Sequence, residues 1–285
     1  MSRIIRIVGL VLAVFVLAVA VVAIWSHATM EAAITQWRDR VAGIGADQPS
    51  PKPNVEALAV LPDPVRRYVA FTFPNGVPDR TESVWITMEG DFRRPGATVF
   101  EPTTAHQVAA PGTPAFVFDA TTPIFGGVWA RVYDAFVDGD MDMKARLLST
   151  LTVVDVTGSP ELDQISLRRW LIESPLYPMA LLPGGPVIWE PIDDRHARAV
   201  VSWRDMEAAL VATFREDGAL LAFRAEEDGD LSTPYHGSGE VGTRDDYRMV
   251  AGMRLPHAFT LSRAGDGETY PFWRGRVTAF EVQRF

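Results

Sequence analysis

The chain has 285 residues, with 27 lysines and arginines against 36 aspartates and glutamates, and therefore a net charge of -9. Acidic proteins bind phosphate backbones poorly, so nucleic acid is excluded as an expected partner. The chain contains no cysteine, which excludes disulfide bonds, a catalytic thiol and attachment to lipid through an N-terminal cysteine.

An uncharged apolar run dominates the N-terminus, from Ile7 to Trp25, and Arg3 and Arg6 precede it. At about 1.5 Å per residue, a helix of this length spans a hydrocarbon core of about 30 Å. We therefore expect residues 1–27 to form a single-pass anchor in the cytoplasmic membrane. The two arginines favour a cytoplasmic N-terminus, which places the C-terminal domain on the extracytoplasmic side. A cleaved signal peptide is the alternative, although its apolar region is usually shorter.

Residues 28–54 are expected to connect this anchor to a folded domain. The segment Thr29–Val41 is predicted to be a short helix that continues the membrane helix outward. The next segment, Gly43–Pro53, contains three prolines, which favour extended backbone over a continuous helix. The sequence therefore predicts a helix followed by a Pro-rich stalk.

The first half of the folded domain, residues 55–285, is predicted to consist mostly of strands. It opens with a helix, in which Asp63 is expected to cap the exposed amides and Pro64 to occupy the first helical position. From Ser83 onward, apolar and polar residues alternate as in a half-buried strand. Four further strands are expected at residues 104–109, 115–120, 128–137 and 145–156. The short connections between them predict an antiparallel meander.

A helix is predicted to interrupt the strands at Ser159–Glu173. Ser159 is a suitable cap, Pro160 suits the first turn, and Glu161 complements the positive end of the helix dipole. One more helical turn is expected at residues 179–182. Strands then resume at residues 187–191, 197–203, 208–215, 220–226, 245–250, 258–263 and 274–285. The predicted class is α+β and mainly antiparallel β, with a curved sheet or incomplete β-barrel covered by one or two helices.

A series of short motifs extends along the domain from Leu61 to Phe285. They are Leu61-Pro62-x-Pro64-Val65-x-Arg67-Tyr68, Glu89-Gly90-x-Phe92-Arg93, Phe116-x-Phe118-Asp119-Ala120, Arg169-x-Leu171-x-Glu173, Pro178-x-Ala180-Leu181-Leu182, Trp189-Glu190 and Gly252-x-Arg254-Leu255-Pro256. As a series they resemble an uncharacterised bacterial domain-of-unknown-function family. The chain departs from the family pattern at Phe118, where the family has tryptophan, and after Asp134, where the family has a tyrosine- and glycine-rich segment. The resemblance supports the domain limits and implies no mechanism.

The predicted layout of strands around a covering helix also resembles the half-barrel of periplasmic lipoprotein carriers and lipid-binding lipoproteins. This second resemblance concerns architecture, and a shared fold does not determine function. It nevertheless makes the hollow of the predicted sheet a place to look for a ligand.

Sequence patterns for metal and nucleotide binding are absent. The histidines are too scattered to form a ligand pair, and no glycine-rich loop joins a strand to a helix. Asp138, Asp140 and Asp142 have the spacing of the first calcium ligands in a loop, but Met143 stands where glycine belongs and Ser149 where the closing acid belongs. We interpret this segment as an acidic turn between strands, and we expect neither a metal nor a cofactor.

Asp119 and Glu173 are the candidate catalytic residues. Each lies among apolar neighbours in the sequence, and burial raises the pKa of a carboxyl group toward the range used in acid–base catalysis. The alternative is structural: each acid is buried in an ion pair with an arginine and holds the helix to the sheet. The arginines nearest in sequence are Arg131, Arg168 and Arg169.

Aromatic residues suggest a binding function. A curved sheet either fills its hollow with large side chains or leaves a cavity lined by them, and both outcomes remain open. The candidate ligand-binding residues are Phe116, Trp129, Tyr133, Trp170, Trp189 and Trp203.

Together with the anchor, these residues lead to the hypothesis of a membrane-anchored extracytoplasmic domain that binds a lipid or another hydrophobic ligand. Such a domain would act as a carrier or sensor in the cell envelope. One alternative is an envelope hydrolase that uses the carboxylate pair. Another is an interaction module that binds a protein partner, of unknown identity, through a sheet edge.

Overall fold

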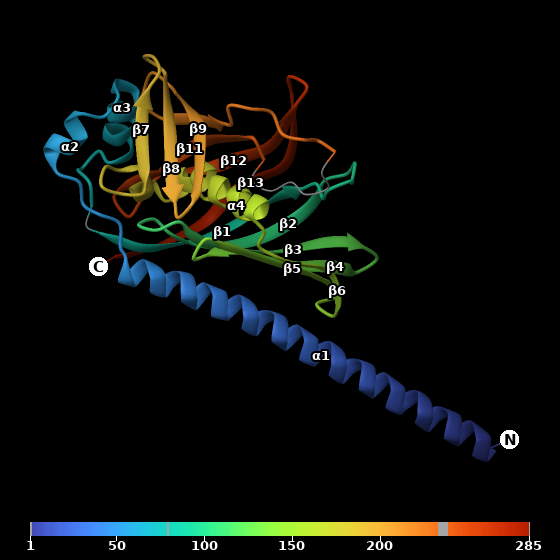
Figure 1. Cartoon of the computed structure of the whole chain (residues 1–285). Coiled ribbons are helices and arrows are strands. Elements are labelled where there is room, and N and C mark those ends of the chain that lie inside the picture. Colours follow the sequence, from blue (N-terminus) through green and yellow to red (C-terminus); the bar gives the residue numbers. More distant parts are fainter. Residues whose placement is uncertain (1, 79, 233–238, 285) are drawn as a thin grey trace.

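The computed structural model describes residues 2–78, 80–232 and 239–284. A long helix, α1 (Ser2–Asp47), projects from a domain built on one antiparallel sheet (Figure 1). The first half of the domain contributes β1 (Thr81–Phe92), β2 (Glu101–Ala110), β3 (Ala115–Phe125), β4 (Val128–Val137), β5 (Asp140–Leu147) and β6 (Leu151–Thr157). The second half contributes β7 (Val187–Pro191), β8 (His196–Trp203), β9 (Met206–Phe214), β10 (Leu220–Arg224), β11 (Val241–Val250), β12 (Met253–Gly265) and β13 (Glu268–Arg284).

Within the described residues, the sheet has 13 strands in the order β6-β5-β4-β3-β2-β1-β13-β12-β11-β10-β9-β8-β7. Each half is a meander of neighbouring hairpins, and the halves join where β1 pairs with β13. The edge strands β6 and β7 do not pair with each other, so the curved sheet stays open (Figure 1). This arrangement confirms the predicted class, an incomplete β-barrel with covering helices.

Helix α4 (Pro160–Glu173) connects the two edge strands and lies in the hollow of the sheet (Figure 1). Its start is as predicted, because the Ser159 hydroxyl accepts a hydrogen bond from the Leu162 amide. Two short helices follow, η1 (Ser174–Leu176) and η2 (Pro178–Leu181). The side chains of Leu167, Trp170 and Leu171 are fully buried among apolar residues of the inner face of the sheet. The main core therefore lies between α4 and the concave face.

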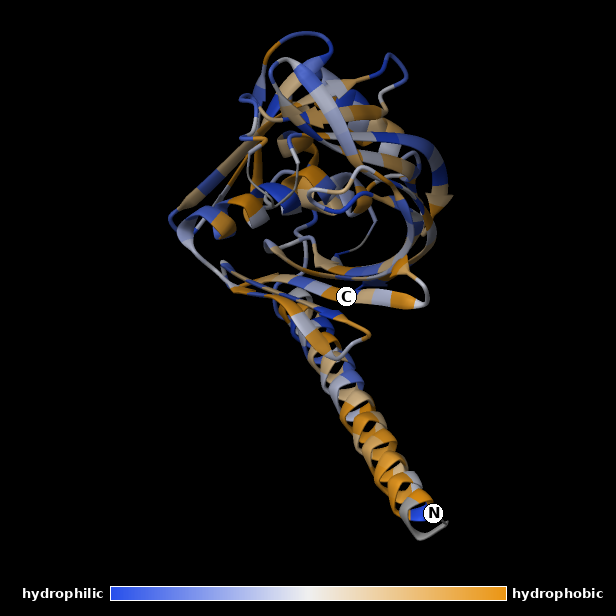
Figure 2. Cartoon of the chain, turned by 90° about the vertical axis from the view of Figure 1, so that its right-hand side faces the viewer, coloured by the Kyte–Doolittle hydropathy of each residue, from blue (hydrophilic) through white to orange (hydrophobic). Residues whose placement is uncertain are grey.

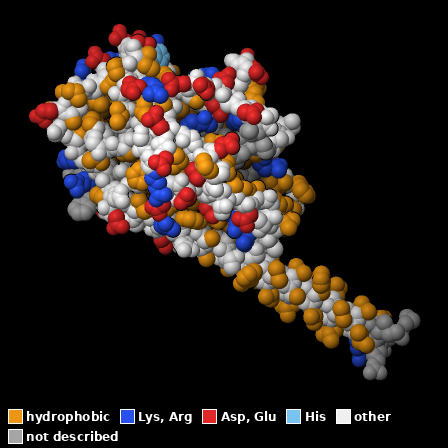
Figure 3. Space-filling model, in the orientation of Figure 1, with side chains coloured by type: hydrophobic (Ala, Val, Ile, Leu, Met, Phe, Trp, Pro, Cys, Tyr) orange, Lys and Arg blue, Asp and Glu red, His pale blue; other side chains and the backbone are white. Residues whose placement is uncertain are grey.

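The two halves of α1 have different surroundings. The apolar half is exposed, and it is the uniformly hydrophobic part of the projecting helix in Figures 2 and 3. It is long and apolar enough to cross a membrane. From Ser26 onward the helix buries one stripe of residues, which contains Ser26, Met30, Ile34, Val41 and Gly45. Spacings of four and seven residues place this stripe on one helix face, which packs on the convex side of the sheet.

Extended backbone was predicted for Gly43–Pro53, and this prediction is wrong for residues 43–47, because α1 continues to Asp47. A β-carbon on Gly45 would lie 2.0 Å from the carbonyl oxygen of Glu82, so glycine lets the helix approach the backbone of β1. Beyond the helix, the Ser50 amide donates to the Thr81 carbonyl, and the Thr81 amide donates to the Ser50 hydroxyl. Most of the segment expected as a stalk thus lies against the sheet.

Two details of the short helices differ from expectation. Helix α2 (Val55–Ala59) was not predicted, and it is capped by the side chain of Asn54, which accepts from the Ala57 amide at 2.7 Å. Helix α3 (Asp63–Thr72) begins one residue earlier than expected, with Pro62 as its cap residue. The Asp63 side chain makes no cap hydrogen bond and instead pairs with Arg66 at 2.8 Å.

The segment 145–156, predicted as one strand, is the end of β5, a turn and β6. The turn contains Leu148 and Ser149, both with positive φ, at 51° and 53°. Turns of this kind usually contain glycine or asparagine. Because neither residue is present here, the sequence carries no turn signal. Of the acidic turn predicted from Asp138 to Asp142, only Asp138 lies in the turn between β4 and β5, because β5 begins at Asp140. Phe285, the last residue of the expected final strand, lies outside the described residues.

Candidate functional site

The candidate site lies where α1 crosses the convex face of β2 to β5. Apolar contacts hold the helix there: Met30 and Ile34 pack on Tyr133, and Val41 packs with Val117 and neighbouring residues. All five side chains are buried. Helix α1 and the sheet thus form one body, in which polar groups between the two are held in fixed positions.

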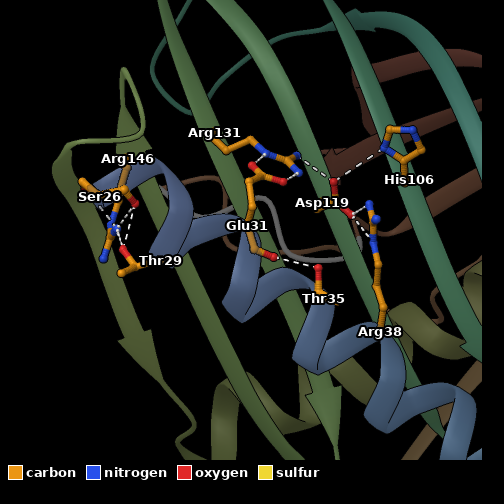
Figure 4. A network of polar contacts seen from close by, with 9 residues as sticks. All are labelled: Ser26, Thr29, Glu31, Thr35, Arg38, His106, Asp119, Arg131 and Arg146. Atoms are coloured by element: carbon orange, nitrogen blue, oxygen red, sulfur yellow. Dashed lines mark hydrogen bonds and ion pairs between the residues drawn. The ribbon is translucent and has the colours of Figure 1, made fainter. Parts of the chain in front are cut away.

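Asp119 of β3 is the centre of a network between helix and sheet (Figure 4). Its side chain is fully buried. One carboxylate oxygen accepts from Nε and Nη2 of Arg38 at 3.1 and 2.5 Å, and the other accepts from Nη1 of Arg131 at 2.6 Å. His106 Nδ1 lies 3.6 Å from the second oxygen. Burial of this acid is compensated by two arginines, one from α1 and one from β4.

Arg131 also binds Glu31 of α1. Its Nε and Nη2 donate to the two carboxylate oxygens of Glu31 at 2.7 and 3.0 Å, a bidentate pair. The order of charges is therefore Arg38, Asp119, Arg131, Glu31, which alternates in sign and sums to zero. Such a chain fixes helix and sheet without leaving a buried charge uncompensated.

The pKa values of both acids lie below their usual range. Burial opposes ionisation of Asp119, but His106 and the charges of Arg131 and Arg38 outweigh it and lower the pKa of this carboxyl group. Hydrogen bonds from Arg131 are the main reason that the pKa of Glu31 is lowered. Both carboxylates are therefore ionised at neutral pH, and they act as hydrogen-bond acceptors and not as proton donors.

A second group of polar contacts joins β5 and the turn that follows it to α1, and Figure 4 shows those of Arg146 in β5. The Ser26 hydroxyl donates to the carbonyl of Ser149 at 2.7 Å. Arg146 Nη1 donates to the carbonyl of Ser26 at 2.9 Å and to the Thr29 hydroxyl at 3.1 Å. Because Ser26 directly follows the apolar run, this turn lies beside the C-terminal end of the apolar half of α1.

Between these two groups is an open cavity of about 320 Å³, here called the junction pocket. Its lining combines two imidazoles, one carboxylate, one guanidinium, three hydroxyls and one indole, from His27, Glu31, Thr104, His106, Thr121, Trp129, Arg131 and Ser149. The Ser149 side chain is fully buried, and its hydroxyl has no hydrogen-bond partner among the described residues. An unpaired buried hydroxyl costs about 1–3 kcal/mol.

A second open cavity, of about 350 Å³, lies at one end of the hollow. Its walls are α4, β8, β9 and the segment 225–228. Arg198, one of its lining residues, is already paired with Glu190 and Glu226 at the surface. The lining lacks aromatic side chains and consists mainly of charged groups, of which Arg198 and Glu226 pair with each other. The junction pocket is therefore the stronger candidate.

The six aromatic residues considered as ligand contacts do not come together. Phe116, Trp170 and Trp189 are buried in the main core, where Trp189 stacks on Phe223 and donates to the Leu181 carbonyl at 2.9 Å. Trp203 packs at the border of the same core. Tyr133 lies beneath α1, on the other face of the sheet, and Trp129 lines the junction pocket.

The two candidate catalytic acids lie on opposite faces of the sheet. Asp119 faces α1, whereas Glu173 is at the end of α4 in the hollow. Glu173 accepts from Arg169 Nε at 3.0 Å and from Gln107 Nε2 at 2.8 Å. The two carboxylates have no common partner among the described contacts, and each is paired with an arginine. Their arrangement matches the structural alternative and does not form a carboxylate dyad.

Sequence reasoning did not identify Glu31, Arg38 or Ser149 as site residues. Glu31 and Arg38 are seven residues apart, which places them on one helix face, and this face also carries Ile34. The mixture of apolar and charged residues on one face is the signal that this part of the helix packs on a partner with complementary charges. No local pattern identifies Ser149, whose position depends on the turn. Among the described residues, no group of three or more His, Cys, Asp or Glu could hold a metal ion.

Residues 59–281 match the profile of a family described as a family of unknown function, DUF6920. The chain belongs to this family. The match confirms the resemblance inferred from the motifs. No curated protein matches the chain.

A crystal structure from Vibrio parahaemolyticus, described as an outer membrane lipoprotein-sorting protein domain, is similar to this chain. The likeness covers 70% of this chain and 85% of the other, with 9% sequence identity and a TM-score of 0.32.

The DUF6920 match includes only part of the junction pocket. His106, Trp129, Arg131 and Ser149 lie inside the matched range, whereas the α1 residues that line the pocket precede it. The pocket therefore forms between the family domain and the helix that precedes it in the chain.

Proposed function

We propose that this protein is a membrane-anchored extracytoplasmic domain that binds the polar head of a membrane lipid in the junction pocket. The observation that carries the proposal is the position of the pocket. It is bounded by His27 and Ser149, directly beside the end of the apolar run at Trp25. With the apolar half of α1 across the bilayer, these residues are at the depth of the lipid headgroups.

The chemistry of the lining supports a headgroup that carries both a cationic and an anionic group. Glu31 is 38% exposed in its side chain and keeps free acceptor positions for an ammonium group, although it is paired with Arg131. His106, about half exposed, offers a ring N–H donor for phosphate oxygens. Trp129, with an apolar ring and a polar N–H, suits the boundary between headgroups and acyl chains. Phosphatidylethanolamine has this combination of groups.

The packed hollow favours a sensor over a carrier. A carrier must enclose acyl chains away from water, and the hollow in this protein is occupied by α4 and by buried aromatic side chains. In the junction pocket, a lipid would place only its head against the protein while its chains stay in the bilayer beside α1. The conformation of the domain would then depend on the lipid composition of the membrane, because α1 and the sheet share the network around Asp119.

Native mass spectrometry of the full-length chain tests this proposal. The protein would be released from nanodiscs of phosphatidylcholine that contain a minor fraction of phosphatidylethanolamine or phosphatidylglycerol. We expect one phosphatidylethanolamine to be retained in preference to the other two lipids. Retention of no lipid, or of all three in proportion to their abundance, would contradict the proposal.

A pair of threonine variants provides the control for this experiment. Thr104 is an exposed strand residue that lines the pocket, so Thr104→Trp fills the pocket and should abolish selective retention. Thr243 is an exposed strand residue of β11 that does not line it. The Thr243→Trp variant should retain the lipid as the original chain does.

A further inference from the structure

We infer that the ends of the β3–β4 and β5–β6 hairpins form a second membrane-contact surface, which inserts into the headgroup layer of the bilayer beside α1. This inference rests on the proposed insertion of α1 in a membrane, but not on lipid binding in the junction pocket. The proposed surface overlaps the junction pocket only at Trp129, and its partner is the bilayer as a whole, not a single lipid headgroup.

Four large apolar side chains are exposed at the ends of these hairpins, and we call them the hairpin cluster. Phe125 is 73% exposed, Trp129 37%, Leu148 43% and Leu151 63%. The two hairpins are adjacent, since the Leu148 amide donates to the Trp129 carbonyl at 2.8 Å and β4 pairs with β5 along its length. The four residues therefore belong to one end of the sheet.

The hairpin cluster lies at the depth where α1 enters the membrane. The turn that contains Leu148 also contains Ser149, whose carbonyl accepts the hydroxyl hydrogen of Ser26. The preceding residue, Trp25, is 68% exposed and ends the apolar surface of the helix. In Figure 1, the β5–β6 end of the sheet lies beside the middle of α1, where its projecting half begins. The exposed apolar surface of the helix thus continues onto the hairpins.

The location of the hairpin cluster beside residue 26 indicates which partner covers it. An exposed group of Phe, Trp and Leu side chains indicates either a protein partner or a membrane. A bilayer that surrounds residues 7–25 necessarily borders a turn that is hydrogen-bonded to residue 26. Aromatic and leucine side chains gain free energy when they enter the interfacial layer, to a depth of about 5–10 Å. Arg146 and His27, which adjoin the turn, supply polar groups suited to the headgroups.

Two membrane contacts, the apolar half of α1 and the hairpin cluster, would fix the orientation of the domain on the bilayer. A single helix would not fix it. The Arg38–Asp119 pair fixes the sheet on α1, and the hairpin cluster would fix how the helix and sheet tilt on the bilayer. The same end of the sheet would then face the membrane at all times. The junction pocket, which shares Trp129 with the hairpin cluster, would stay at the level of the headgroups.

The absence of cysteine permits a direct test, because a single introduced cysteine is a unique labelling site. Full-length Phe125→Cys and Leu151→Cys would be labelled with an environment-sensitive fluorophore and placed in phosphatidylcholine nanodiscs with spin-labelled lipid quenchers. The matched control is Ile188→Cys, which is 66% exposed in the opposite edge strand, β7. We expect several-fold stronger quenching at positions 125 and 151 than at 188, and strongest with quenchers near the headgroup.

Quenching at positions 125 and 151 that is no greater than at 188 would overturn the inference, provided that the labelled chains unfold at the same temperature as the original. The samples contain purified chain and lipid only, so a protein partner cannot produce the signal. The Thr104→Trp background separates this inference from the proposed function. Filling the pocket should abolish lipid retention and leave quenching at 151 unchanged, whereas loss of quenching in that background would contradict an independent membrane contact.

Discussion

Arg38 of α1 donates two hydrogen bonds to one carboxylate oxygen of Asp119, a fully buried acid of β3 that is 81 residues away in the chain. The other oxygen of Asp119 accepts from Arg131, which in turn binds Glu31 of the same helix. Helix α1 and the sheet are therefore joined by charges as well as by apolar contacts. Movement of one is expected to move the other.

Replacing Asp119 with asparagine should destabilise the docked helix strongly. The variant leaves Arg131 and Arg38 without their shared counter-charge, and removal of one member of a buried ion pair costs about 3–5 kcal/mol. The free energy of unfolding in detergent solution measures the effect. Asp217→Asn is the control, since Asp217 pairs with Arg215 at the surface, and it should cost less than about 1 kcal/mol. Equal effects of the two substitutions would contradict the assigned role.

Docking of α1 should weaken in acid. The pKa values of Asp119 and Glu31 are lowered in the folded chain, so their contribution is complete above the unfolded pKa values, near pH 4. It is lost as the pH falls through the lower folded pKa values. Amide hydrogen exchange in residues 26–47, compared at pH 6 and below pH 4, should show faster opening in acid, after correction for intrinsic rates. Asp119→Asn should remove much of this difference, and an unchanged pH dependence would count against the network.

Two glycines of α1 should respond in opposite ways to alanine. A β-carbon at Gly45 would collide with the Glu82 carbonyl, so Gly45→Ala should push the helix from β1 and cost about 1–3 kcal/mol. Gly43 has open space around its β-carbon position. Gly43→Ala should therefore stabilise the helix by about 0.5–1 kcal/mol. Thermal unfolding of both variants measures the difference, and destabilisation by both would refute the close approach at Gly45.

Asp119 and Glu173 should act independently. Because the acids lie on opposite faces and share no partner among the described contacts, the cost of replacing both should equal the sum of the single costs within about 0.5 kcal/mol. A double-mutant cycle with Asp119→Asn and Glu173→Gln measures this coupling. A large interaction free energy would indicate that the two carboxylates work as a pair, as the hydrolase alternative requires.

Elements with local signals were predicted well from the sequence. The helix from Pro160 to Glu173, with Ser159 as its cap, is correct because a cap, a first-turn proline and an apolar sector coincide there. Strand β4 is correct because its mainly apolar run lies between Gly126-Gly127 and Asp138-Gly139. The turn at Leu148 was missed because its backbone has positive φ without glycine or asparagine. The extent of α1 was underestimated because Gly43 and Gly45 suggest a break, whereas the contact with β1 keeps the helix intact.

The candidate site could be predicted only in part. Asp119 and Trp129 were identified by residue type and local context, and Arg131 was named among the possible arginine partners of the acids, but the α1 partners Arg38 and Glu31 were not identified. Arg38 and Glu31 reach Asp119 and Arg131 across 81 and 100 residues of sequence, and such pairings depend on strand order and helix docking. The filled hollow also depends on tertiary structure, because the same aromatic residues could line a cavity or fill a core.

The most direct measurement of the central claim is the site at which a lipid headgroup contacts the protein. Full-length chain in membranes that contain a phosphatidylethanolamine with a photoreactive headgroup would be irradiated, and the crosslinked peptides mapped by mass spectrometry. We predict adducts on the strands and turn that line the junction pocket, around His106, Trp129 and Ser149, and their loss in Thr104→Trp. Adducts confined to the apolar half of α1, or unchanged in Thr104→Trp, would contradict lipid binding in this pocket.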